Sequence, residues 1–147
     1  MKSKLIGPFR GITCQVEAAC FPKTAALNVL LVPSTGADII ALTQNLGQGL
    51  PLYQAFLGEG ILNVDDSAFM DFAEANGLGH IVAYKRYDID LVPGQARKVA
   101  AVFQFDRTSL MALDPVGCSR YEQHYAKLGH RHVGQQRQRV QNNSALR

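Results

Sequence analysis

The sequence predicts an antiparallel α+β domain, a fold class that three observations indicate. Short stretches of alternating apolar and polar residues are typical of half-buried strands. Turn-forming residues separate these stretches at short intervals, which favours strands joined by tight turns. Two segments carry the capping patterns of helices. We therefore expect a sheet of five or six strands with two or three helices in a single domain.

Length and composition agree with one globular domain. The chain has 147 residues, of which 47% are hydrophobic and 18% charged, as in ordinary globular proteins. We place the domain at residues 1–132 and expect 133–147, which lack apolar periodicity, to be a flexible basic tail. No signal peptide and no apolar run long enough to span a membrane is visible, so we expect a cytoplasmic protein.

The first half of the domain is predicted to start with three strands. Residues 12–21 alternate, which places Cys14 and Cys20 on the inward face as small apolar residues. A disulfide between them is not expected, because an extended strand separates them by about 20 Å. The apolar run 25–32 and the segment 39–46 follow after turns. The three segments predict an antiparallel meander.

The middle of the chain is predicted to hold two helices. In the Gly-rich segment 47–64, apolar residues recur at helical spacing, which favours a short helix that ends at Gly58. A second, clearer helix follows Asp65 and Asp66, which can accept hydrogen bonds from its first turn. Gly77 is expected to end that helix in a left-handed conformation, with the following leucine folding back.

The second half is predicted to contain a hairpin and a terminal helix. Residues 80–91 and 98–106 read as its two strands, joined by a tight turn at 92–96. Residues 109–114 favour a further strand. The last helix is expected to start at Ser119, since the S-x-x-E pattern forms a capping box. This helix should dock on the sheet through Tyr121, Tyr125 and Leu128 and end at Gly129.

The charge distribution suggests nucleic acid as a partner. Residues 1–118 carry nine Lys/Arg against eleven Asp/Glu, whereas residues 119–147 carry six against Glu122 alone. A basic extension can track a phosphate backbone, although a solvated tail has the same composition. The candidate contact residues are Lys127, Arg131, Arg137 and Arg139 in this region, and Lys85 and Arg86 in the predicted strand 80–91.

A metal site is the alternative interpretation of the stretch "CSRYEQHYAKLGHRH". Cys118, His124, His130 and His132 have the ligand types that zinc prefers. Their spacing fits poorly, because a helix through His124 separates the cysteine from the last two histidines and no second cysteine is near. We therefore expect no metal and no other cofactor.

No motif of an enzyme active site is readable. The chain contains no phosphate-binding glycine loop, no H-E-x-x-H motif and no marked nucleophile with its base. We expect a non-enzymatic protein that binds a macromolecular partner, with a homodimer through sheet edges or faces as a further prediction. The alternative is a small enzyme or small-molecule binder whose pocket lies between the sheet and the 47–64 segment.

One family resemblance bears on the genetic setting of this protein. "LLVPSTGADIIALTQNLGQGL" followed by "FMDFAEANGLG" resembles a pattern in small uncharacterised proteins of plasmids and other mobile elements. In these proteins a hairpin ends in an Asn-Leu turn, and a short helix with an acidic cap closes with Gly-Leu. The resemblance covers residues ~27–80. It implies a fold and a mobile-element setting, and it assigns no site residue.

Overall fold

The structure is a computed structural model that describes residues 5–9, 11–61, 68–87 and 98–142, the last fourteen of them by their backbone alone. In chain order the elements are β1 (Leu5–Phe9), β2 (Ile12–Cys20), β3 (Leu27–Pro33), β4 (Ile40–Ala41), β5 (Thr43–Gln44), β6 (Gln54–Leu57), α1 (Ala68–Ala75), β7 (Gly79–Tyr87), β8 (Lys98–Phe105), α2 (Arg107–Leu113) and α3 (Pro115–Asn142). The α+β class is confirmed. The expected Asp65–Asp66 cap and the turn at 92–96 lie outside the described residues.

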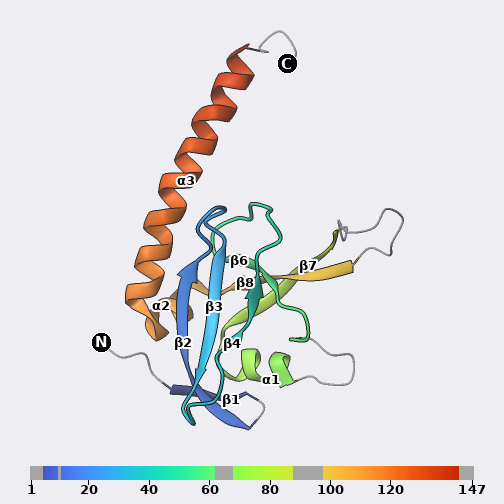
Figure 1. Ribbon diagram of the computed structural model, residues 1–147, viewed down its shortest axis with the longest axis vertical. Coiled ribbons are helices and arrows are strands. Elements are labelled where there is room, and N and C mark those ends of the chain that lie inside the picture. The colour runs from blue at the N-terminus through green and yellow to red at the C-terminus, as the bar shows by residue number, and fades with distance from the viewer. Residues whose placement is uncertain (1–4, 10, 62–67, 88–97, 143–147) are drawn as a thin grey trace.

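The strands form two antiparallel sheets, so the single sheet of five or six strands is not confirmed. The first sheet has the order β1-β2-β3-β4 and the second the order β5-β6-β8-β7. Figure 1 shows the two sheets side by side, with α2 and the start of α3 beside β2 and with α1 below. The expected meander of β2, β3 and the following strand is present in the first sheet.

Leu42 joins the two sheets. The segment 39–46, expected as one strand, is divided at this residue into β4, which pairs with β3, and β5, which pairs with β6. The Leu42 N–H donates to the carbonyl of Val29 at 3.0 Å, and its carbonyl accepts from the N–H of Gly58 at 2.8 Å. Its side chain is fully buried. The chain thus passes from one sheet to the other at a bend.

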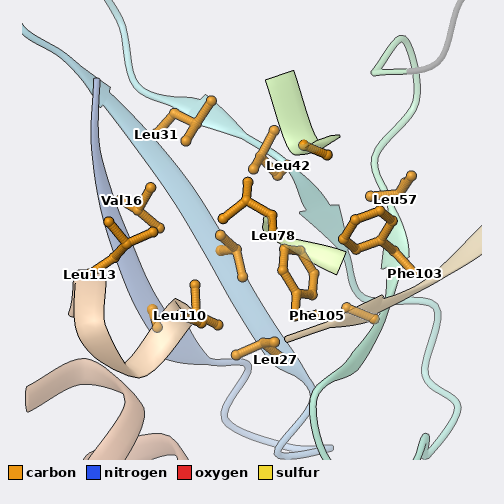
Figure 2. Packing of buried hydrophobic residues seen from close by; sticks show 14 of the residues in the cluster. Val16, Leu27, Leu31, Leu42, Leu57, Leu78, Phe103, Phe105, Leu110 and Leu113 are labelled. Atoms are coloured by element: carbon orange, nitrogen blue, oxygen red, sulfur yellow. The ribbon is translucent and has the colours of Figure 1, made fainter. Parts of the chain in front are cut away.

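One apolar core fills the space between the sheets. It takes side chains from both sheets and from α1, α2 and α3, and Figure 2 shows Val16 and Leu31 of the first sheet facing Phe103 and Phe105 of the second. Helix α1 contacts β1 and β7, the outer strands of the two sheets. Its Phe72 packs against Phe9 of β1 with ring centroids 5.2 Å apart. Helix α1 therefore covers the end of the core between β1 and β7.

The expected end of α1 is confirmed. Gly77 has φ +60°, the left-handed conformation that glycine adopts without steric cost. The Leu78 N–H donates to the carbonyl of Ala73 at 2.9 Å, and the Gly77 N–H donates to that of Glu74 at 3.2 Å. This pattern is a Schellman motif. Leu78 is fully buried, which fixes the chain as it enters β7.

Two segments adopt the opposite structure to the one expected. The predicted helix in 47–64 is wrong, because Gln54–Leu57 forms β6 and pairs with β5 and β8. Ala55 and Leu57 face the main core, and Phe56 packs on the other side in a small second cluster. With both faces buried, this strand has no alternating polarity that would reveal it.

The predicted strand at 109–114 is also wrong, because residues 109–113 belong to α2 and Asp114 is its C-cap. The carboxylate of Asp106 accepts from the backbone N–H of Ser109 at 2.9 Å and from its hydroxyl at 2.7 Å. Asp106 is therefore the N-cap of the helix. Leu110 and Leu113, one turn apart, are both buried, so the apolar run has a helical core face.

Helix α3 starts one turn earlier than the S-x-x-E pattern predicts. Pro115 is its first residue, and the carboxylate of Asp114 accepts from the N–H of Gly117 at 3.0 Å. Proline suits the first helical position, and aspartate suits the cap. Gly129 does not end the helix, which continues to Asn142. The flexibility of 133–147 stays a prediction.

Candidate functional site

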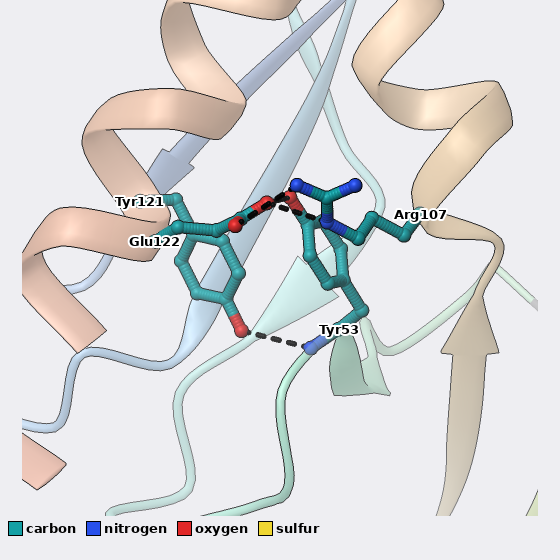
Figure 3. A network of polar contacts seen from close by, with 4 residues as sticks. All are labelled: Tyr53, Arg107, Tyr121 and Glu122. Carbon is teal, nitrogen blue, oxygen red and sulfur yellow. Dashed lines mark hydrogen bonds and ion pairs between the residues drawn. The ribbon is translucent and has the colours of Figure 1, made fainter. Parts of the chain in front are cut away.

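A polar network joins three separate parts of the chain beside the core (Figure 3). The carboxylate of Glu122 on α3 pairs with the guanidinium of Arg107 on α2 through two contacts, of 3.0 and 3.2 Å. The hydroxyl of Tyr53, in the turn before β6, donates to the same carboxylate. Such a bidentate pair fixes both charged groups. The network therefore ties both C-terminal helices to the second sheet.

Tyr53 is held in an unusual backbone conformation. Its φ is +64°, in the left-handed region that a bulky residue seldom adopts. Its N–H donates to the hydroxyl of Tyr121 at 2.9 Å, and the two rings meet edge to face with centroids 5.1 Å apart. Both side chains are buried. The surrounding contacts thus stabilise a conformation that is strained by itself.

Burial and hydrogen bonding shift the pKa values of the groups in this network, in the directions expected of a structural cluster. Burial, together with the hydrogen bond to Glu122, raises the pKa of the Tyr53 hydroxyl. Burial raises the pKa of the Cys118 thiol to about 11. The hydrogen bond from Tyr53 and the pairing with Arg107 lower the pKa of Glu122. Because the thiolate is the reactive form of cysteine, the raised pKa leaves little of the Cys118 thiol in its reactive form at neutral pH.

The four candidate metal ligands do not come together in the described part of the chain. Cys118 is fully buried beside Tyr53. A ring nitrogen of His124 lies 3.1 Å from the carbonyl oxygen of Pro22, at the turn between β2 and β3. His130 and His132 are positions of α3 whose side chains lie outside the description. Among described residues, no group of three potential ligands is gathered, and the absence of a metal stays a prediction.

The six candidate nucleic-acid contacts lie on two elements that extend beyond the sheets. Lys127 is exposed on α3, and Lys85 and Arg86 are exposed on β7. Arg131, Arg137 and Arg139 are positions in the last part of α3. In Figure 1, α3 rises past the top of the sheets, whereas the hairpin of β7 and β8 leaves them at the upper right. The candidates thus form two separate basic regions and no single patch.

The described residues line at least two hollows on the surface. One, of about 640 Å³, follows β2 along the start of α3, where Glu17 and Arg120 both line it. The other, of about 340 Å³, lies between Leu52 and Tyr53 on one side and the ends of β7 and β8 on the other. Its polar lining residues include His80, Gln104, Asp106 and Arg107. The second hollow has the location that the small-molecule alternative requires.

Sequence reasoning missed Tyr53 and Arg107. Tyr53 was expected inside a helix, and Arg107 had no assigned role. Their partner Glu122 is 69 residues from Tyr53 and 15 from Arg107 in the chain. No local pattern marks such a contact, since only the packing of α2 and α3 on the sheets creates it.

The comparisons with known proteins add no identification. No family model, no curated protein and no solved structure matches this chain. Among the described helices, none has the length and apolar character that crossing a membrane requires.

Proposed function

We propose that this protein is a non-enzymatic nucleic-acid-binding protein that contacts the phosphate backbone through α3. Six Lys/Arg against one Glu in residues 119–147 supply the charge. Phosphate contacts by Lys and Arg release counterions and so provide affinity without reading sequence.

The observation that carries the proposal is the ion pair that Glu122 forms with Arg107. It is the one acidic residue in 119–147, and it pairs with Arg107 of α2 instead of a cation of α3. Arg120 and Lys127 form no ion pair with any described residue. The cations of α3 are therefore not neutralised by the acid on their own helix.

Helix periodicity places these cations together. Arg120 and Lys127 are seven residues, about two turns, apart, and both are exposed. Position 131 follows one turn later on the same face. We call Arg120, Lys127 and position 131 the basic face of α3. Cys118, which is fully buried, lies on the opposite, docked side. Binding through the basic face would leave the core contacts intact.

Salt-dependent binding tests the proposal. Anisotropy of a labelled DNA duplex should show binding at low salt that falls steeply as salt rises, with a log–log slope of about −0.9 for each phosphate neutralised. Replacing Arg131, Arg137 and Arg139 by Gln should flatten the slope by about 0.9 for each arginine that contacts phosphate. The matched control replaces Gln135, Gln136 and Gln138 of the same helix by Ala and should leave the slope unchanged.

Truncation after His132 separates binding from folding. Because residues 133–147 offer only scattered apolar groups, the truncated chain should keep nearly the full melting temperature. It keeps the basic face of α3 but loses Arg137, Arg139 and Arg147, so it should still bind the duplex at low salt, with a flatter salt slope. Absence of binding by the full-length protein at low salt would rule out the proposed function.

A second candidate function is small-molecule binding in the hollow of about 340 Å³ beside Tyr53. Its size is at the lower end of ligand pockets, and apolar walls with a few polar groups are typical of such sites. Non-denaturing mass spectrometry of the purified protein should then show a bound small molecule, absent from a Leu52→Trp variant that fills the hollow. Detection of the bare chain alone would speak against this candidate.

We also propose a reducing, cytoplasmic location. All three cysteines are free, and Cys14 and Cys118 are buried. Proteins of oxidising compartments more often pair their cysteines.

Both the mobile-element setting and the homodimer stay predictions. A light-scattering mass near 16.1 kDa at high concentration would contradict the dimer.

A further inference from the structure

The hairpin of β7 and β8 exposes an unusual number of apolar side chains. Among the described residues, six large hydrophobic side chains are exposed, and three of them, Val82, Tyr84 and Val99, belong to this hairpin. Tyr84 has the largest exposed fraction of the six, at 65%. Clustered exposed apolar groups indicate a binding surface more often than single ones do.

These side chains are exposed because the outer part of the hairpin extends beyond the core. Near its base, Phe103 and Phe105 of β8 point into the main core. Further along, Tyr84 pairs with Ala101, and Arg86 pairs with Val99. Cross-strand partners share a face, and residues two apart in a strand do as well. Tyr84, Arg86 and Val99 therefore lie on one face, which continues the core-facing side of the sheet outside the body.

The charged residues of the hairpin indicate which kind of partner binds this face. The two strands carry Lys85, Arg86 and Lys98 and no carboxylate. The segment that joins them, outside the described residues, adds Asp88, Asp90 and Arg97. Lys85 and Arg86 form no ion pair with a described residue. An exposed aromatic ring beside a cation that pairs with no described residue is complementary to an unpaired base with its phosphate.

We propose that Tyr84 is a stacking platform for an unpaired base, with Arg86 on the same face contacting the adjacent phosphate, so that the preferred partner is single-stranded nucleic acid. The inference rests on the proposed function and refines its substrate class. Stacking on an aromatic ring accepts any base, since every base has a π-face. A base inside a duplex is stacked on its neighbours and is not available to Tyr84.

Fluorescence provides a direct test, because the chain contains no tryptophan. A Tyr84→Trp variant has a single reporter at the proposed platform. An oligothymidylate of about 12 nucleotides should quench its emission, whereas a duplex of equal length bound at the same salt should not. The matched control is Ile39→Trp, since Ile39 is also exposed, at 57%, but lies just before β4 in the first sheet. Its emission should respond to neither probe.

Affinity measurements complete the test. Tyr84→Ala should weaken binding of the single strand about 5- to 150-fold, the range of one lost stacking contact, and leave duplex binding unchanged. Tyr84→Phe should bind the single strand like the original chain. Equal weakening for both probes, or none for either, would overturn the inference while the proposed function stands.

Two further outcomes are decisive. If the full-length chain binds neither probe at low salt, both the inference and the proposed function fail. If Tyr84→Ala instead converts a dimer to a monomer in light scattering, the face is an interface with a second copy, and the stacking role is overturned.

Discussion

Tyr121 contacts Tyr53 in two ways, through its hydroxyl, which accepts from the Tyr53 N–H at 2.9 Å, and through its ring, which meets the Tyr53 ring at 74°. The pair joins α3 to the turn before β6, where the backbone of Tyr53 is left-handed. The position of α3 and the conformation of this turn therefore depend on each other.

The Tyr121 hydroxyl should contribute more to stability than that of Tyr125. Tyr121→Phe leaves the buried N–H of Tyr53 without an acceptor, which should lower the free energy of unfolding by about 1–3 kcal/mol. Tyr125 is only half-buried and donates to the carbonyl of Leu50 at 3.2 Å. Tyr125→Phe should cost about 0.5–1.5 kcal/mol. Urea unfolding measures both, and equal losses would argue against the role of the Tyr53 N–H.

Gly79 should tolerate no side chain. Its φ is +145°, and a Cβ at this position would overlap the carbonyl oxygen of Gln104 in the paired strand. Gly79→Ala should therefore destabilise the fold by about 3 kcal/mol or more, from backbone strain and steric overlap together. The control is Gly49→Ala, where a Cβ meets nothing within 4 Å. Thermal melts of the two variants should differ clearly, and similar melts would refute the close approach of β7 to β8.

Acid should destabilise the protein partly through Glu122. The folded state lowers the pKa of this carboxyl, so its contribution is present above the unfolded value of about 4.3 and is lost as pH falls through the folded value. Melting temperatures measured from about pH 6 to pH 3 should fall less for Glu122→Gln than for the original chain. Glu17→Gln, an exposed change on β2, should leave the profile unaltered.

The three cysteines should react at different rates with a thiol reagent. Cys20 is half-buried, whereas Cys14 and Cys118 are fully buried. Burial also raises the pKa of the Cys118 thiol to about 11, which reduces the reactive thiolate. Under native conditions one thiol should react quickly and two slowly. Cys20→Ser should remove the fast phase, and its persistence in that variant would show that another cysteine is accessible.

Local sequence patterns predicted the elements that have one buried and one exposed face. Strand β2 and the hairpin of β7 and β8 are of this kind. A local pattern also predicted the glycine that ends α1. Their hydrogen bonds and burial follow from residues a few positions apart. The class of the fold was therefore readable from the sequence, although its division into two sheets was not.

The wrong predictions have a common physical origin. The residues of β6 are buried on both faces, and the apolar run in α2 fits a strand or a helix equally well until the Asp106 cap is recognised. The network of Tyr53 with Glu122 depends on how distant elements pack. Propensity and periodicity contain no information on such contacts, because tertiary packing decides between local alternatives of similar free energy.

The contact between Ala18 and Asp114 has a consequence for biosynthesis. Strand β2 pairs with β1 only as far as Gln15 among the described residues, and beyond it the Ala18 N–H donates to the carboxylate of Asp114, 96 residues later in the chain. At a synthesis rate of about 5–20 residues per second, Asp114 is added roughly 5–20 seconds after Ala18. This stretch of the β2 edge has no Asp114 to contact during that time. Nascent chains that end before Asp114 therefore expose a bare strand edge, the kind of template on which chains aggregate. We expect such truncated chains to need a chaperone to stay dispersed during translation in vitro, whereas chains ending at His132 should not. Sedimentation of the two translation products would reveal the difference.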